Sequence, residues 1–277
     1  MNTRGQVTLP TAGHERNTME LLRMTDRVAL VTGACGWLGS AMSRAFAEAG
    51  ARVVVTSRNA EQAEKFAATL PGTGHLGVGL MQSDTDGIPD FVSTIAKQMG
   101  RIDVLVNNAY GGTTPTIQNA SVDDFDRSYH DGVTTYFLLA REIMLHLRER
   151  HAPGSIINIA SINGVTGSYP KIYEGLAVVS PPNYHALKGA LLQLTRHLAV
   201  YWAPYNIRVN AISPGHFPTP AIVAKSSEFV NRIQEMIPLG RTARPEEIKG
   251  VALLLASDAG SYITGQNLLV DGGWTAW

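Results

Sequence analysis

The stretch Arg27-Val-Ala-Leu-Val-Thr-Gly-Ala-Cys-Gly-Trp-Leu-Gly39 begins as an apolar run and ends in a cluster of glycines. From there to Gly50, apolar residues recur at helical spacing, at Leu38, Met42, Ala45, Phe46 and Ala49. A short apolar run bounded by glycine predicts a buried strand, and the 3.6-residue period after it predicts a helix. The stretch therefore predicts a strand, a tight turn and a helix in immediate succession.

The same alternation repeats along the chain. Further strands are predicted at 52–56, 76–81, 102–107, 155–160, 207–212 and 267–270, and further helices at 60–70, 88–98, 122–150, 183–202 and 245–257. Strand–helix–strand units with Val-rich strands pack as a parallel sheet that carries helices on both faces. The predicted fold class is therefore α/β, a Rossmann-type doubly wound sheet of seven parallel strands in a single domain.

Size and charge exclude several classes of partner. The chain has 277 residues, 44% of them hydrophobic, which suffices for one large core but not for two domains of ordinary size. Lys and Arg together number 23, as do Asp and Glu, so no basic surplus favours nucleic acid or anionic lipid. No apolar run approaches the roughly 20 residues of a membrane-spanning helix. We therefore expect neither nucleic-acid nor membrane partners.

The amino-terminal residues and the cysteine content bear on domain limits and location. Residues 1–23 contain no apolar block of signal-peptide length, and we expect them to form a flexible tail ahead of a domain at 24–277. Cys35 is the only cysteine, so no internal disulfide can form, and one thiol alone does not build a zinc site. These features favour a cytoplasmic protein, and we expect no metal.

Gly33 and Gly36 stand where the first strand must turn sharply into the first helix. Such a turn brings backbone N–H groups and the positive end of the helix dipole against a pyrophosphate, here with Trp37 and Leu38 at the start of the helix. An ordinary strand–helix turn would carry the same glycines. The position after the first strand of a βαβ series is what favours a dinucleotide site.

The end of the second strand bears on the choice of dinucleotide. It reads Thr56-Ser-Arg-Asn59, without the acidic residue that would bind an NAD ribose. Arg58 is suited instead to pair with the 2′-phosphate of NADP. NADP(H) is therefore favoured and NAD(H) remains open; the alternative is that Arg58 is a solvated loop residue.

Tyr184 and Lys188 are four residues apart, which on a helix places a phenol and an ammonium on one face. A phenol has a pKa of about 10, and a nearby cation brings its proton exchange closer to neutral pH. Ser161 directly follows a predicted strand, where its hydroxyl can hold a substrate oxygen while Tyr184 transfers a proton. The three residues are a candidate catalytic group.

The motifs, taken in this order, resemble the short-chain dehydrogenase/reductase family from about residue 26 to the carboxyl terminus. The stretches that carry the resemblance are the Thr32-Gly33 turn, Asn107-Asn-Ala109, Asn158-Ile-Ala-Ser161, Tyr184-x-x-x-Lys188, Ser213-Pro-Gly215 leading to Thr219, and Gly265-Gln-Asn-Leu-Leu-Val-Asp-Gly-Gly273. Each motif alone is weak, whereas their joint order is specific to the compact type of this family.

The resemblance implies an NAD(P)-dependent oxidoreductase that moves a hydride between nicotinamide and a carbonyl or secondary alcohol. It implies that Ser161 orients the carbonyl, that Tyr184 is the acid/base, and that Lys188 lowers the phenol pKa and holds the nicotinamide ribose. Further cofactor contacts are expected from Asn108, Ala109, Phe217, Thr219 and, at the adenine, Asp84.

The sequence departs from the family pattern in three places, two of them at single positions and the third an insert. Trp37 occupies a position where the family carries glycine, and Gly36 gives a spacing commoner in longer, epimerase-like relatives. The turn is then either reshaped, or Trp37 covers part of the pyrophosphate. Gly132 stands where an asparagine usually relays protons to the lysine through water, and Asp131 or a water is the expected substitute.

An insert at about 165–182 lengthens the segment between Ser161 and Tyr184 beyond what is usual in the family. Its aromatic and polar residues suit a wall or lid beside the reaction centre, and the alternative is a loop that contacts another subunit. The insert resembles a subset of the family associated with sugars and sugar acids. This resemblance points to a polar, sugar-like small-molecule substrate.

Two alternative functions remain open. The Gly36 spacing suggests an epimerase or dehydratase that uses bound nicotinamide transiently, and Gly132 suggests a cofactor-bound scaffold or sensor with little turnover. The family commonly forms oligomers, so we expect a homotetramer or homodimer, with Trp274 and Trp277 packed against a neighbouring subunit.

Overall fold

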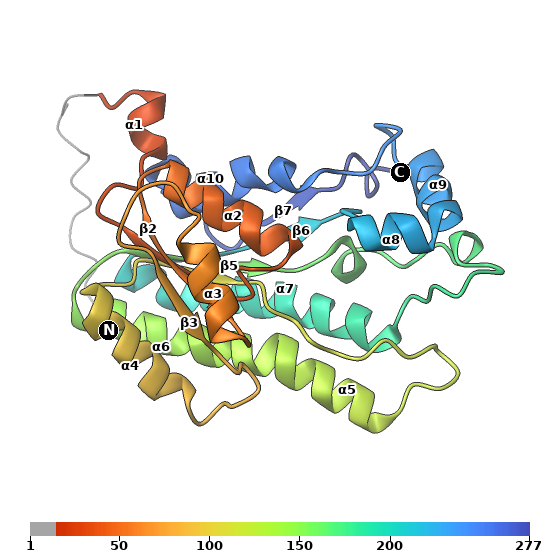
Figure 1. The fold of residues 1–277 in the computed structure, drawn as a ribbon, viewed down its shortest axis with the longest axis horizontal. Coiled ribbons are helices and arrows are strands. Elements are labelled where there is room, and N and C mark those ends of the chain that lie inside the picture. The colour runs from red at the N-terminus through yellow and green to blue at the C-terminus, as the bar shows by residue number, and fades with distance from the viewer. Residues whose placement is uncertain (1–14) are drawn as a thin grey trace.

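The computed structural model describes residues 15–277, and it contains one sheet of seven parallel strands, as predicted (Figure 1). The order across the sheet is β3-β2-β1-β4-β5-β6-β7. The strands are β1 (Val28–Val31), β2 (Arg52–Ser57), β3 (Leu76–Gly79), β4 (Val104–Asn107), β5 (Gly154–Ile159), β6 (Ile207–Pro214) and β7 (Asn267–Val270). Because the order reverses between β1 and β4, a crevice opens outside the carboxyl ends of these two strands.

Helices cover both faces of the sheet (Figure 1). The α-helices are α1 (Thr18–Leu22), α2 (Trp37–Glu48), α3 (Ala60–Ala67), α4 (Ile88–Met99), α5 (Val122–Tyr129), α6 (Thr135–Glu149), α7 (Pro182–Trp202), α8 (Pro220–Lys225), α9 (Ser227–Met236) and α10 (Lys249–Ala256). Side chains of α2, α3 and α10 form a core on one face, and those of α4, α6 and α7 form a core on the other. The central strands are buried on both faces, which explains their continuous apolar sequence.

The folded chain begins before the predicted domain boundary at residue 24. Of the expected tail, residues 1–14 lie outside the described residues, whereas Thr18–Leu22 form α1. Asn17 and Glu20 make a capping box at its start, and Arg16 Nη1 lies 2.5 Å from Asp258 Oδ2. Part of the segment expected to be a tail is thus a short capped helix.

Two predicted segments differ from the structure. The single helix predicted at 122–150 is divided, because a π-helical segment, His130–Thr134, separates α5 from α6. The loop expected after β6 contains α8, which Thr219 caps by accepting a hydrogen bond from the Ile222 N–H. Between residues 15 and 277, no helix has the length and apolar character needed to span a bilayer.

A small apolar cluster lies beside the main core, where the insert meets the end of the chain. It joins Ile172, in a short 3-10 helix of the insert, to Ile233 of α9, to Ile237 directly after that helix and to Trp274. Trp274 is only 3% exposed and packs on Tyr169 with ring centroids 5.4 Å apart. The expectation that Trp274 packs on another subunit is therefore wrong; it stabilises its own chain, whereas Trp277 is exposed.

Candidate active site

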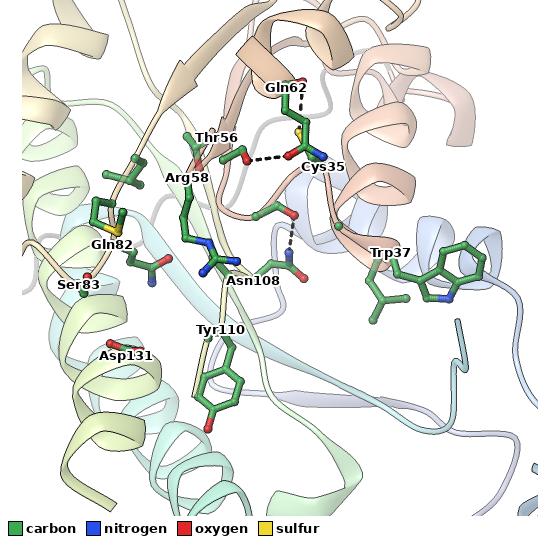
Figure 2. A pocket seen from close by; sticks show the side chains of 18 residues that line it. Cys35, Trp37, Thr56, Arg58, Gln62, Gln82, Ser83, Asn108, Tyr110 and Asp131 are labelled. Atoms are coloured by element: carbon green, nitrogen blue, oxygen red, sulfur yellow. Dashed lines mark hydrogen bonds between the residues drawn. The ribbon is translucent and has the colours of Figure 1, made fainter. Parts of the chain in front are cut away.

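A cavity of about 530 Å³ occupies the crevice at the carboxyl edge of the sheet. Residues from the turns after β1, β2, β3 and β4 line it, and Figure 2 shows how these turns surround it. The predicted cofactor residues found in its wall are Gly33, Gly36, Trp37, Leu38, Arg58, Asn108 and Ala109. Segments far apart in the sequence thus converge on one site.

The glycine turn forms the floor of this cavity. Gly33 has φ +60°, and a Cβ on it would lie 3.0 Å from the Ala109 Cα. A Cβ on Gly39 would lie 2.3 Å from the Gly33 carbonyl oxygen, so α2 can approach the turn only without a side chain there. Gly36 is the N-cap of α2 and has no side chain to compete for the first N–H groups of the helix. The turn therefore fits a pyrophosphate.

Thr32 and Asn108 fasten the turn after β1 to the turn after β4. Thr32 Oγ1 accepts hydrogen bonds from the N–H groups of Asn108 at 2.8 Å and Ala109 at 3.0 Å. In return, Asn108 Nδ2 donates to the carbonyl oxygens of Thr32 at 2.9 Å and Gly33 at 3.2 Å. The asparagine is thus a structural support of the groove as well as part of its lining.

Arg58 and Trp37 have different relations to the cavity. Arg58 follows β2, and its side chain points into the cavity, whereas the Trp37 indole is turned away from Arg58 and Asn108 (Figure 2). Trp37 is 37% exposed.

Two predicted cofactor residues, Asp84 and Thr219, line neither this cavity nor the smaller one beside it. Asp84 Oδ1 accepts a hydrogen bond from the Gly87 N–H at 3.3 Å, within the turn before α4. Gln82 and Ser83, two residues that sequence reasoning missed, line the cavity after β3 instead. Thr219 is engaged as the N-cap of α8 and is likewise outside the lining.

A second cavity, of about 240 Å³, adjoins the first. Ser161, Tyr184, Lys188 and Phe217 line it, and Leu38, Asn108 and Tyr110 belong to the walls of both cavities. The catalytic candidates and the dinucleotide candidates therefore share one continuous site. Tyr110 was missed, although it directly follows the quoted Asn107-Asn-Ala109 motif, and extending that motif by one residue would have found it.

Ser161 and Tyr184 face each other in the second cavity. Ser161 Oγ accepts a hydrogen bond from the Asn163 N–H at 3.1 Å, which orients the hydroxyl. Burial raises the pKa of the Tyr184 phenol, a hydrogen bond with Ser161 lowers it, and Tyr110 raises it. The net direction is opposite to that expected from Lys188 alone, so the phenol is fully protonated at neutral pH and is a proton donor.

Lys188 is only 3% exposed. Its Nζ donates a hydrogen bond to the Ile159 carbonyl oxygen at 2.6 Å. The rings of Tyr184, Tyr110 and Tyr136 surround it, with centroids 5.4, 5.6 and 5.9 Å from Nζ. Burial lowers the pKa of the Lys188 ammonium from 10.5 to about 7. The lysine therefore changes charge near neutral pH.

Gly132 lies in the π-helical segment, next to the reaction centre. A Cβ on it would lie 2.7 Å from Leu187 Cδ1 and 3.4 Å from the Tyr110 ring. The space that a larger side chain would need is thus taken by neighbours. Asp131, the proposed substitute for the relay, lines the dinucleotide cavity.

Polar contacts hold the insert in place near its two ends, which form its base, and near its middle, which forms its tip. Ser168 Oγ and Ser180 Oγ, near its two ends, lie 3.0 and 2.7 Å from His185 Nε2. Near the tip, Arg232 of α9 donates to the carbonyl oxygens of Lys171 at 3.2 Å and Glu174 at 2.7 Å. His185 directly follows Tyr184 on α7, so the insert is tied to the element that carries the phenol. The tie brings the base of the insert close to the phenol, but no residue of 165–182 lines either cavity.

Comparisons with known proteins agree with this geometry. A family model described as enoyl-(acyl carrier protein) reductase matches residues 33–275. Meso-2,3-butanediol dehydrogenase of Serratia marcescens is 33% identical over 255 residues, which cover 92% of this chain and 97% of the relative.

Solved structures match over nearly the whole chain. A short-chain type dehydrogenase/reductase from Mycobacterium marinum has a TM-score of 0.85 at 31% identity, covering 94% of this chain and 99% of that one. A gluconate 5-dehydrogenase from Burkholderia cenocepacia J2315, in complex with NADP and tartrate, has a TM-score of 0.84 at 30% identity, covering 94% and 100%.

Proposed function

Because this chain belongs to the short-chain dehydrogenase/reductase family and is an oxidoreductase of the CH–OH/C=O type that uses a nicotinamide cofactor, we propose that Ser161, Tyr184 and Lys188 carry out its chemistry. One observation carries the proposal. The small cavity with these three side chains adjoins the larger cavity built on the glycine turn, and the two share Leu38, Asn108 and Tyr110. A reacting carbon can therefore lie between the cofactor and the phenol.

The residues present fit a dinucleotide. The N-terminus of α2 and the Gly33 turn are suited to the pyrophosphate, and Lys188 is suited to the ribose next to the nicotinamide. When bound, the nicotinamide supplies or accepts the hydride. Gln82 and Ser83 take the place proposed for Asp84 at the adenine end.

The protein's own groups manage the substrate oxygen. Ser161 donates a hydrogen bond to that oxygen and holds it beside Tyr184. In reduction the Tyr184 phenol gives its proton to the oxygen, and in oxidation the phenolate takes a proton back. Lys188 in its charged form lowers the free energy of the phenolate, because an ammonium nearby favours the anion.

The substrate we propose is a small, hydroxyl-rich carbonyl or alcohol. Two similarities support this choice: the Serratia marcescens relative is a butanediol dehydrogenase, and the Burkholderia cenocepacia structure is a gluconate 5-dehydrogenase with tartrate present. We propose that the insert borders this substrate, since it is tied through His185 to the helix that carries Tyr184 and through Arg232 to α9. The epimerase and scaffold alternatives are not favoured by these relatives.

The direct test combines binding and turnover. The protein is titrated calorimetrically with NADPH and with NADH, and cofactor oxidation is then followed by absorbance with keto-sugars, keto sugar acids, acetoin and simple ketones. Binding together with turnover of a hydroxylated ketone supports the proposal. Turnover of simple ketones alone rejects the polar substrate, and absence of dinucleotide binding rejects the site.

For the cofactor we propose a preference for NADP(H), carried by Arg58. Arg58→Asp removes a charge-assisted hydrogen bond to the 2′-phosphate and adds a repulsive carboxylate. We expect the ratio of NADPH to NADH affinity to fall by about 10- to 100-fold, since such bonds contribute roughly 1.5–3 kcal/mol. Calorimetric titrations measure both affinities. The matched control is Arg196→Asp on the exposed face of α7, and an equal ratio in both variants removes Arg58 from the site.

The contacts of His185 with Ser168 and Ser180, at the base of the insert, lead to a second expectation. His185→Ala removes the partner of Ser168 and Ser180 and loosens the substrate wall, whereas the dinucleotide cavity is built from other turns. We expect KM for the substrate to rise about fivefold, the equivalent of one hydrogen bond, with the NADPH Kd unchanged. His197→Ala, on the same helix, is the control. An unchanged KM would assign the insert to another role.

We also propose that the chain forms a homo-oligomer. Val122, Phe125 and Tyr129 are 75%, 41% and 53% exposed and lie on one face of α5 at helical spacing. Aromatic and branched side chains gathered in this way are typical of a contact surface. The proposal rests on this stripe and on the symmetry common among soluble enzymes.

A further inference from the structure

Three tyrosines enclose the Lys188 ammonium, and they come from three different elements. Tyr184 lies on α7, Tyr136 on α6, and Tyr110 on the turn after β4. All three ring centroids are within 5.9 Å of Nζ. The only hydrogen bond of the ammonium within residues 15–277 goes to the Ile159 carbonyl oxygen. The charge is therefore held mainly by aromatic faces.

Of the three tyrosines around Lys188, Tyr110 alone lines both cavities. Its ring packs against the Tyr184 ring, with centroids 5.4 Å apart and planes at 55°. It also lies against Gly132, where a Cβ would come within 3.4 Å of the ring. The absence of a side chain at Gly132 leaves room for this aromatic ring beside the lysine.

Hydrogen bonds fix the Tyr110 ring in this place. Its hydroxyl donates to Ser128 Oγ on α5 at 3.1 Å. Ser128 Oγ in turn accepts from Asn183 Nδ2 at 2.7 Å, and Asn183 is the neighbour of Tyr184 on α7. Ser128 and Asn183 are both only 1% exposed. The buried hydrogen bonds made through its hydroxyl therefore fix the orientation of the Tyr110 ring.

We propose that Tyr110 is a positioning residue of the reaction centre, whose aromatic face stabilises the charged form of Lys188 and whose edge holds the Tyr184 phenol in place. The catalytic meaning of this inference rests on the function proposed above, but the contact itself does not. The Tyr110 ring then gives Lys188 part of the support that a polar side chain would otherwise provide. The absence of a side chain at Gly132 leaves room for this ring.

The electrostatic surroundings of Lys188 set the direction of the effect. The titratable groups that face it are the phenols of Tyr184, Tyr110 and Tyr136, and Asp131 in the π-helical segment acts on Tyr110. A ring face attracts a cation most strongly where water is excluded. Removing one of three faces while keeping water out therefore favours the neutral amine and lowers the midpoint at which Lys188 titrates.

The experiment compares Tyr110→Leu with Tyr110→Phe. Leucine keeps an apolar group but loses the ring face, and phenylalanine keeps the ring but loses the bond to Ser128. Each full-length variant is labelled with ¹³Cε-lysine, and the Lys188 resonance, assigned by its absence in Lys188→Met, is titrated with pH. Tyr110→Met is prepared as a second ring-less variant, in case the leucine variant does not fold.

We expect the Lys188 midpoint to be about one pH unit lower in the ring-less variant than in Tyr110→Phe, and to be nearly the same in Tyr110→Phe as in the unsubstituted protein. Equal midpoints in the ring-less and phenylalanine variants, or a higher midpoint in the ring-less one, overturn the inference. The titration uses no substrate or dinucleotide, so its result is independent of the cofactor and substrate tests of the proposed function.

Discussion

Tyr184→Phe is expected to lower kcat by about 10³-fold and to leave the NADPH affinity within about twofold. The substitution removes one oxygen, the proton donor, from a buried phenol that faces Ser161, and general acid–base groups contribute about 10²- to 10⁴-fold to rate. The glycine turn and Arg58, which are proposed to bind most of the dinucleotide, are untouched. Steady-state kinetics with the substrate found in the panel, together with calorimetry, measures both quantities.

The matched control is Tyr201→Phe, which makes the same change near the other end of α7, where the side chain is 65% exposed. It should leave kcat unchanged. Retention of more than a tenth of the activity by Tyr184→Phe would show that another group supplies the proton, and the assignment of the acid/base would then be wrong.

Lys188→Met is expected to lower kcat by about 10²-fold or more and, at the same time, to stabilise the fold. A depressed pKa of about 7 means that the charged form is disfavoured by burial, and the corresponding penalty at pH 7 is about 4 kcal/mol. Methionine fills a similar volume without charge but leaves the Ile159 carbonyl oxygen unpaired, which costs about 2 kcal/mol. The net expectation is a gain of about 2 kcal/mol in unfolding free energy at pH 7.

The pH dependence separates this explanation from simple repacking. Between pH 7 and 10.5 the unfolded chain binds more protons at Lys188 than the folded chain does, so the contribution of this lysine makes stability rise with pH. Below pH 7 the penalty is fully present, and above 10.5 it is gone. The advantage of Lys188→Met should therefore be largest at pH 7 or below, vanish near pH 9 and become a disadvantage of about 1 kcal/mol by pH 10, because the unpaired Ile159 carbonyl oxygen still costs about 2 kcal/mol there.

Urea unfolding of both proteins at several pH values measures this difference. A stability gain that is the same at pH 7 and pH 10 would mean that packing, and not the buried charge, is responsible. A loss of stability at all pH values would show that the ammonium is better solvated than its burial suggests.

The sheet could be predicted because its signal is local and repeated. Runs such as 28–31 and 104–106 are apolar throughout, and parallel strands that are buried on both faces need no alternation. The break in the helix predicted at 122–150 carries no such signal, because a π-helical turn leaves the apolar spacing on either side nearly unchanged. The helix after Thr219 was missed, although Thr followed by Pro220 is a common way to start one.

Some residues of the site could likewise be predicted from the sequence, and others could not. Gly33, Arg58 and Tyr184 follow strands or share a helix face, so topology alone brings them to one edge of the sheet. Asp84 could not be placed, because a carboxylate in a turn can bind a backbone N–H of that turn as well as face a ligand, and here it accepts from the Gly87 N–H. Tyr110 could have been added to the site by extending the Asn107-Asn-Ala109 motif by one residue, whereas its contact with Gly132 joins segments that share no sequence pattern.

The closure of the insert at its base has a consequence for how this scaffold can change. Since Ser168 and Ser180 both meet at His185, the residues between them form a loop whose two ends are already joined. The entropy of closing such a loop grows only with the logarithm of its length, by about 0.6 kcal/mol for each doubling. Tyr169 and Ile172 pack in the small apolar cluster, and Arg232 binds the carbonyl oxygens of Lys171 and Glu174, so this logarithmic cost applies to the remaining residues 175–179. That short segment can be lengthened or shortened at little entropic cost while the proton-transfer residues stay unaltered.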